Sequence, residues 1–207
     1  MTNQTVSIID YGMGNIWSVV SALKYLGYRS EVTSNKDEIA NAKCLLLPGV
    51  GSFRRAMQSL QNLDLDRTIC DSVNKGTKIL GICLGMQLLG IDGTEEGDTN
   101  GLNLIPYKVA KFSKEEVSNR KIPHIGFNSV NFSNNSRLFT GVSPQSDFYF
   151  VHSYRMLPNQ SESEQATCDY GIQFLAAYEK NNIFATQFHP EKSQTNGLIL
   201  LSNFLKV

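Results

Sequence analysis

The first ninety residues alternate between short strand-like runs and longer amphipathic stretches. Strand-forming runs occupy residues 6–9, 29–33, 43–47 and 78–83. Helical patterns separate them, at residues 16–26, after Asn35 and at residues 54–75. The run at 43–47 is almost continuously apolar, which is typical of a strand buried on both faces of a parallel sheet. The alternation predicts an α/β fold, with a central, mostly parallel sheet and helices on both of its faces.

The pattern changes after Gly90 to short, strand-like segments, including residues 108–112, 148–152 and 174–178. Lys180–Asn182 reads as a hairpin turn and residues 158–164 as a flexible loop. A last helix is predicted at residues 194–205. Its expected N-cap is Ser193, and the residues expected on one face are Leu198, Leu201 and Leu205. We therefore expect a strand-rich C-terminal half and, for 207 residues, one domain spanning 1–207.

Composition narrows the functional classes. The chain has 19 basic and 19 acidic residues, so no charge excess points to a nucleic-acid surface. No apolar run approaches the length of a membrane span, and the first residues do not resemble a secretion signal. The four cysteines lack metal-ligand spacing. We expect reduced thiols, a cytoplasmic location, and neither a metal nor another cofactor.

The strongest chemical feature is Cys83, which lies between Gly81 and Gly85 where a predicted strand meets a predicted helix. This is the layout of a nucleophile elbow, in which glycines allow close approach of the backbone. The following N–H groups lack helical partners and can receive an oxyanion, and a helix N-terminus favours the thiolate. A lone cysteine is more often a small buried hydrophobe, so a base is also needed.

The chain has only three histidines from which a base can come. His124 precedes an expected glycine turn, and His152 ends an aromatic strand. His189 ends a predicted strand at residues 183–188 and is followed by proline and Glu191. Proline keeps the preceding residue extended, where residues two apart point the same way. Glu191 is therefore expected to orient His189 as the base for Cys83.

Two glycine-rich segments allow more than one interpretation. Residues 12–14 lack the third glycine of a dinucleotide-binding fingerprint, so a tight turn is expected there, with Asn15 as the N-cap of the next helix. Residues 48–53 follow the buried strand. They can form a simple connection to the next helix, or they can present backbone N–H groups to an anion.

Two segments resemble the signatures of class I (triad) glutamine amidotransferases: Gly81–Gln87 and Phe188–Ser193. Within that family, several further segments resemble the glutaminase subunits of imidazole glycerol phosphate synthase, an enzyme of histidine biosynthesis. These segments are residues 9–15, 47–53, 123–128, 149–154 and 197–205. The resemblance runs almost from end to end with its motifs in order.

The resemblance implies a three-layer amidotransferase fold and hydrolysis of L-glutamine through a glutamyl thioester on Cys83. His189 would relay protons and Glu191 would orient it. The implied oxyanion hole comprises the N–H of Leu84 and an amide of Gly49, Val50 or Gly51. The implied glutamine contacts are Gln87, Ser153 and Tyr154. The resemblance implies no cofactor.

The resemblance also implies a heterodimer with a (β/α)₈-barrel synthase subunit, which receives the ammonia and makes imidazole glycerol phosphate and AICAR. The residues expected at this interface are Asn15, His124 and Phe127. The family usually has Trp where this chain has Phe127, and Phe lacks the indole donor. The alternative partner is a barrel of a paralogous system, which amidinates sugars of surface polysaccharides.

Two further classes compete with a glutaminase. A thiol hydrolase of the α/β-hydrolase type also carries its nucleophile on a glycine-flanked elbow, but its acid precedes the base in the chain, whereas Glu191 follows His189. A non-catalytic scaffold that regulates a barrel partner is the other alternative. The presence of all three triad residues favours catalysis.

Overall fold

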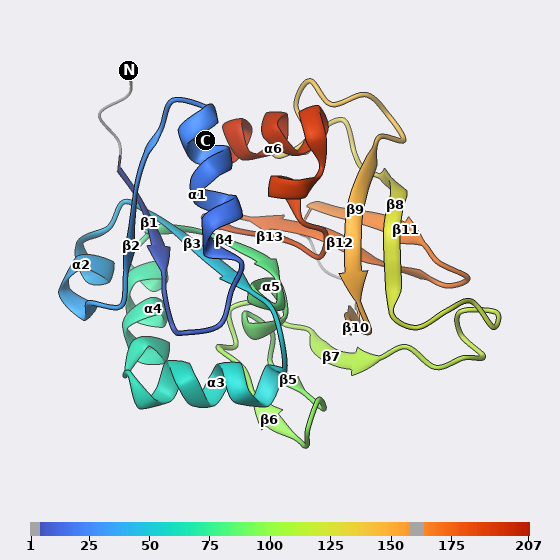
Figure 1. Cartoon of the computed structure of the whole chain (residues 1–207), viewed down its shortest axis with the longest axis horizontal. Coiled ribbons are helices and arrows are strands. Elements are labelled where there is room, and N and C mark those ends of the chain that lie inside the picture. Colours follow the sequence, from blue (N-terminus) through green and yellow to red (C-terminus); the bar gives the residue numbers. More distant parts are fainter. Residues whose placement is uncertain (1–4, 158–163) are drawn as a thin grey trace.

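Nine strands form one sheet in a computed structural model of the chain, which describes residues 5–157 and 164–207 (Figure 1). The strand order is β2-β1-β3-β4-β13-β12-β11-β8-β9. The first five strands are parallel: β2 (Arg29–Thr33), β1 (Thr5–Ile9), β3 (Cys44–Gly49), β4 (Lys78–Cys83) and β13 (Ile183–Thr186). All four predicted N-terminal strands are therefore confirmed.

The rest of the sheet is antiparallel and comes from the C-terminal half. It comprises β12 (Gln173–Lys180), β11 (Glu164–Asp169), β8 (His124–Asn131) and β9 (Asp147–His152). A smaller sheet holds β10 (Tyr154–Leu157), β7 (Lys108–Lys111), β5 (Asp92–Gly93) and β6 (Thr99–Asn100). The predicted hairpin is confirmed, because Lys180 pairs with Ile183. Of the predicted loop at 158–164, residues 158–163 lie outside the described residues.

Helices cover both faces of the sheet. The helices α1 (Ile16–Tyr25) and α6 (Gln194–Lys206) pack on one face (Figure 1). Those on the other face are α2 (Lys36–Asn41), α3 (Phe53–Asn62), α4 (Leu65–Asn74) and α5 (Leu84–Leu88). Side chains of β3 alternate between the two apolar cores, with Leu46 in the first and Leu45 and Leu47 in the second. The α/β prediction is confirmed, since a strand buried on both faces needs helices on both sides.

The helical pattern predicted at residues 54–75 is confirmed, but it forms two helices and not one. The chain forms α3 and α4, and Asp64 between them has a left-handed φ of 52°. A 22-residue helix would be about 33 Å long, whereas a six-residue strand such as β3 spans about 20 Å. The break lets both helices stay over the sheet. Aspartate tolerates the left-handed conformation better than most residues. The apolar periodicity continues across Asp64, so the sequence pattern did not predict the break.

Of the predicted helix caps, one forms as expected. The side chain of Asn35 accepts hydrogen bonds from the N–H groups of Asp37 and Glu38. Asn15 and Ser193 occupy N-cap positions without a capping bond from their side chains. The Ser193 hydroxyl instead binds the backbone of the segment before α6. Within the described ranges no helix is long and apolar enough to cross a bilayer.

Parallel strands bring the predicted site together. Cys83 ends β4, and Gly49 ends the adjacent β3 directly opposite it in the register. β13 runs parallel to β4 on the other side, and the chain continues from β13 to His189. The carboxyl ends of neighbouring parallel strands share one edge of the sheet, which is the usual place for a site in an α/β fold.

Candidate active site

Cys83 lies on a strained turn between β4 and α5. Its φ is 55° and its ψ is −109°, a conformation that non-glycine residues rarely adopt. A Cβ on Gly81 would lie 2.8 Å from backbone atoms of Gly85, and a Cβ on Gly85 would lie 1.7 Å from the carbonyl oxygen of Leu47. The elbow predicted from the two glycines is therefore confirmed. Because α5 has only five residues, any help to a bound anion comes from its first N–H groups.

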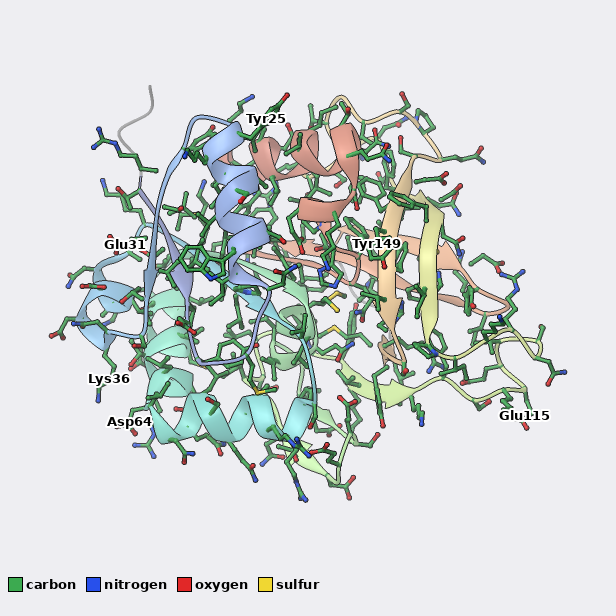
Figure 2. The ribbon with its side chains drawn as sticks, in the orientation of Figure 1. Tyr25, Glu31, Lys36, Asp64, Glu115 and Tyr149 are labelled. Atoms are coloured by element: carbon green, nitrogen blue, oxygen red, sulfur yellow. The ribbon has the colours of Figure 1, made fainter. Side chains whose placement is uncertain are left out.

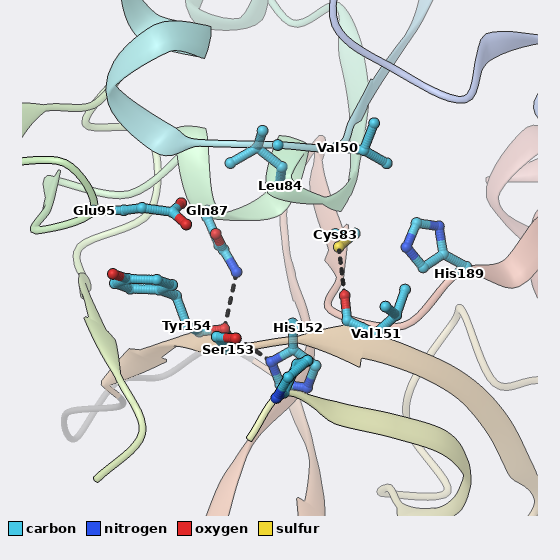
Figure 3. A pocket seen from close by; sticks show the side chains of 12 residues that line it. Val50, Cys83, Leu84, Gln87, Glu95, Val151, His152, Ser153, Tyr154 and His189 are labelled. Atoms are coloured by element: carbon cyan, nitrogen blue, oxygen red, sulfur yellow. Dashed lines mark hydrogen bonds between the residues drawn. The ribbon is translucent and has the colours of Figure 1, made fainter. Parts of the chain in front are cut away.

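His189 and Glu191 form a buried pair. Nδ1 of His189 lies 2.8 Å from Oε1 of Glu191, and the side chains are 2% and 1% exposed. The backbone around the ring is fixed, since Ser193 Oγ donates to the carbonyl oxygen of His189 and the His189 N–H donates to Tyr149. Nε2 of His189 has no hydrogen-bond partner in the described part of the chain. Figure 3 shows the ring beside the Cys83 sulfur.

The environment of His189 favours the imidazolium. Burial on its own lowers the pKa of His189, but the neighbouring Cys83 sulfur and the Glu191 carboxylate outweigh burial and raise the pKa to about 10. The ring is therefore charged at neutral pH and can donate from both nitrogens. The Nδ1–H of the charged ring donates to Glu191. The Nε2–H remains available to donate to a group beside Cys83.

A pocket of about 280 Å³ opens over Cys83. Its lining residues are Val50, Gly51, Cys83, Leu84, Gln87, Glu95, Pro123, Val151, His152, Ser153, Tyr154 and His189. Cys83 and His189 lie toward one end, and Glu95 and Tyr154 toward the other (Figure 3). The described residues contain no group of three or more His, Cys, Asp or Glu side chains placed to hold a metal ion.

The glycine-rich loop after β3 lies beside Cys83. Val50 and Gly51 line the pocket, whereas Gly49 packs against the start of α5. A Cβ on Gly49 would lie 3.0 Å from the N atom of Gly85 and closer still to the Tyr11 hydroxyl, so no side chain fits. Tyr11 is buried and donates to the carbonyl oxygen of Pro48 at 3.0 Å. The Tyr11 hydroxyl therefore holds the start of the loop against the end of β3.

Gln87, Ser153 and Tyr154 all line the pocket, as expected for substrate contacts. Nε2 of Gln87 donates to the carbonyl oxygen of Tyr154 at 2.9 Å and to Oε1 of Gln187 at 3.0 Å. Gln187 also lies with its Nε2 3.7 Å from the Cys83 sulfur. Gln187 was not predicted from the sequence, although it is the polar residue two positions before His189, where side chains point the same way in an extended segment.

Glu95 is a second pocket residue that was not predicted from the sequence. Its carboxylate accepts the backbone N–H of Phe53, the first residue of α3, at 3.0 Å. Burial raises the pKa of Glu95, and this hydrogen bond opposes part of the rise. Nothing in the acidic stretch 92–98 distinguishes Glu95 from its neighbours, because only the fold brings this loop to the pocket.

The three residues expected at a partner interface have different positions. Phe127 is 45% exposed on β8 and packs edge-on against Tyr149, and Asn15 is half-buried before α1. His124 is 1% exposed, so its side chain cannot touch a partner. The glycine turn expected after His124 is also wrong. The segment belongs to β8, where Gly126 has a φ of 135° within the strand.

The sequence profile of the family described as glutamine amidotransferase class-I matches residues 7–207. The imidazole glycerol phosphate synthase subunit HisH of Chlorobium chlorochromatii is 47% identical over 98% of this chain and 100% of that protein. The HisH subunit of Moorella thermoacetica is 45% identical over 96% of this chain and 93% of that protein.

Two solved structures share the fold. The structure of PurLQS from Thermotoga maritima superposes with a TM-score of 0.75 at 17% identity, over 99% of both chains. A crystal structure described as that of a glutamine amidotransferase superposes with a TM-score of 0.76 at 17% identity, over 97% of both chains. With the family profile and the relatives above, the chain belongs to the class I glutamine amidotransferases and, within them, to the family of the imidazole glycerol phosphate synthase subunit HisH.

Proposed function

We propose that this chain is the glutaminase subunit of imidazole glycerol phosphate synthase in histidine biosynthesis. It hydrolyses L-glutamine to glutamate and ammonia and delivers the ammonia to a synthase subunit in the cytoplasm. The observation that carries this function is the buried His189–Glu191 pair beside Cys83 on its strained elbow. The orienting acid follows the base and contacts it directly, which disfavours an α/β-hydrolase arrangement.

In the proposed reaction, the Cys83 sulfur attacks the side-chain amide carbon of glutamine. A C–S bond forms and the carbonyl oxygen becomes an oxyanion. The oxyanion accepts hydrogen bonds from the N–H of Leu84 and from an N–H of the loop Gly49–Gly51. His189 then protonates the leaving nitrogen, the C–N bond breaks and ammonia departs. His189, now neutral, takes a proton from water, and the water oxygen attacks the thioester carbon. The C–S bond then breaks, which releases glutamate and frees the Cys83 sulfur beside the recharged His189. Glu191 holds the ring in one orientation throughout.

We propose that glutamine lies lengthwise in the pocket. With the amide at Cys83, the backbone of Ser153 and the side chain of Gln87 lie along the substrate, and Glu95 faces the other end (Figure 3). Glutamine carries an ammonium group at that end. We propose that Glu95 accepts it, because a partly buried carboxylate is a strong acceptor for a cation.

We further propose that the synthase partner is a (β/α)₈ barrel that binds as a heterodimer over α1, β8 and the start of α6. Apolar side chains exposed there are Trp17 (74%), Tyr25 (79%), Ile125 (59%) and Phe127 (45%). The short helix η1 (Pro190–Lys192) packs against both α1 and β9, and so links these elements. Figure 2 shows Tyr25 at the end of α1 and Tyr149, which contacts Phe127, on β9. Exposed aromatic residues are enriched at interfaces.

A diazoketone analogue of glutamine tests the proposed nucleophile. We expect a single adduct on Cys83, located by peptide mass spectrometry, and slower labelling in excess glutamine. Cys70 is the internal control, since it is a half-buried thiol outside the pocket. A general alkylating agent should also modify Cys70, but the analogue should not. An adduct on Cys70 alone, or labelling of Cys83 that glutamine does not slow, would contradict the proposed function.

A further inference from the structure

A line of three hydrogen bonds runs from Asn128 on β8 to the carbonyl oxygen of Tyr154 at the pocket. Nδ2 of Asn128 lies 3.1 Å from Nε2 of His124, and Nδ1 of His124 lies 3.1 Å from Nε2 of His152. Nδ1 of His152 lies 2.8 Å from the Tyr154 oxygen (Figure 3). The two histidines face each other directly in the pairing of β8 with β9. The proposed reaction uses neither of them.

The chemistry of these groups fixes every proton in the line. A carbonyl oxygen only accepts, so the proton of His152 is on Nδ1. In a neutral ring the Nε2 of His152 is then bare, and it accepts from Nδ1 of His124. The Nε2 of His124 is bare for the same reason, and only the NH₂ side of the Asn128 amide can face it. All three hydrogen bonds therefore point toward Tyr154.

The surroundings keep both rings neutral and fixed. His124 is 1% exposed and His152 6%. The ring of His124 lies between the stacked rings of Phe150 and Tyr170, with centroids 4.8 Å and 4.0 Å away. Burial lowers the pKa of His124 to about 4 and that of His152 to about 3.

Other titratable groups surround the line on each side. They are Arg120 and Tyr170 near His124, Cys168 near Asn128, and Arg155 and His189 near His152. The positive charge of Arg120 opposes protonation of His124, and those of Arg155 and His189 oppose protonation of His152. The line is therefore neutral at physiological pH.

The Tyr154 oxygen also orients a pocket side chain. It accepts one hydrogen bond from Nε2 of Gln87 and another from Nδ1 of His152. These two bonds use both lone pairs of the oxygen. The second N–H of Gln87 Nε2 donates a hydrogen bond to Oε1 of Gln187. The amide of Gln87 is thus held in one orientation by groups that the substrate does not replace. If the Nδ1–H donor of His152 is lost, the Tyr154 carbonyl is no longer fixed, and Gln87 loses the fixed acceptor that orients its amide.

We propose that Asn128, His124 and His152 are positioning residues for glutamine, which hold the Tyr154 backbone and the Gln87 side chain in the geometry that binds the substrate. The kinetic part of this role rests on the proposed glutaminase function. The proton positions do not, because they follow from the folded chain alone. Nuclear magnetic resonance therefore tests the line separately from the activity.

The first experiment is a ¹⁵N spectrum of the imidazole nitrogens, in a chain with only three histidines. We expect His124 and His152 to be neutral at pH 7 with the proton on Nδ1, and His189 to be cationic. The two neutral signals should not change down to about pH 5, since the pKa values are about 4 and about 3. A proton on Nε2 of either ring, or a cation at pH 7, would overturn the proposed line.

The second experiment compares two variants of His152 in the glutaminase assay of the complex. In His152→Asn the amide nitrogen takes the place of Nδ1, whereas in His152→Gln it takes the place of Nε2. We expect His152→Asn to retain a near-normal KM for glutamine. We expect His152→Gln to raise KM by about 3- to 10-fold with a smaller change in kcat, as for the loss of one neutral hydrogen bond. Equal KM values in the two variants would contradict the positioning role.

The third experiment remains informative even if the His152 variants fail to fold. In Asn128→Asp a carboxylate faces the bare Nε2 of His124, so this nitrogen must gain a proton to donate. We expect the pKa of His124 to rise well above 4 in the NMR titration, with KM for glutamine almost unchanged because Nδ1 still donates to His152. An unchanged pKa of His124 would overturn the proposed contact. An inactive wild-type complex would instead overturn the proposed function.

Discussion

The variant Cys83→Ala should lose glutamine hydrolysis by roughly 10⁴-fold or more, because no other group in the triad can form the thioester. The folded chain should be almost unaffected. Alanine also carries a Cβ, so it adds no strain at the φ of 55°. Glutamate release by the complex is the measurement, with the melting temperature measured in parallel.

Two controls separate the chemistry from assembly. The Cys83→Ala complex should still convert its acceptor when ammonium salts replace glutamine, because the proposed synthase partner would use the supplied ammonia directly. Cys70→Ala removes a half-buried thiol that bonds the carbonyl oxygen of Leu102, away from the pocket, and should keep the activity. Glutamate release at a wild-type rate by Cys83→Ala would refute Cys83 as the nucleophile.

Gly85→Ala should destabilise the chain by about 3 kcal/mol, even though alanine favours helices over glycine by about 1 kcal/mol. The sign reverses because the new Cβ would lie 1.7 Å from the Leu47 oxygen, so α5 must move away from β3. For a chain of this size, the melting temperature should fall by roughly 6–12 °C. Glutamine hydrolysis should fall as well, since Cys83 and Leu84 lie on the displaced turn.

Gly14→Ala is the matched control. The nearest atoms to a Cβ at Gly14 are Ile16 Cγ1 at 3.5 Å and the Pro48 oxygen at 3.6 Å, which are ordinary contacts. Its free energy of unfolding should therefore change by no more than about 0.5 kcal/mol. If thermal or urea unfolding showed Gly85→Ala to be as stable as Gly14→Ala, the close approach of α5 to β3 would be incorrect.

The sequence predicted the parts of the site that depend on local chemistry. Gly81 and Gly85 indicate the elbow because a Cβ at either position would contact backbone atoms. The two-residue spacing of His189 and Glu191 predicted the contact between their side chains. The buried strand at 43–47 predicted the parallel sheet. Each of these rests on sterics or periodicity within a few residues, which a sequence displays directly.

The features that the sequence did not predict depend on distant contacts. The break at Asp64 follows from the short length of the strands that α3 and α4 cover, and the burial of His124 follows from stacking on Phe150 and Tyr170. Glu95 reaches the pocket only because its loop returns to the start of α3. No local pattern carries such information, because each residue takes its role from segments far away in the chain.

The most direct test of the central claim is glutamate release from glutamine by this chain mixed with the proposed synthase subunit of the same histidine pathway. It is measured with and without the ribonucleotide acceptor. We expect release to depend on Cys83 and to rise at least about fivefold when the acceptor is bound, as for a moderate coupling between two sites. Release that neither the synthase nor its acceptor changes would contradict the assignment to this synthase.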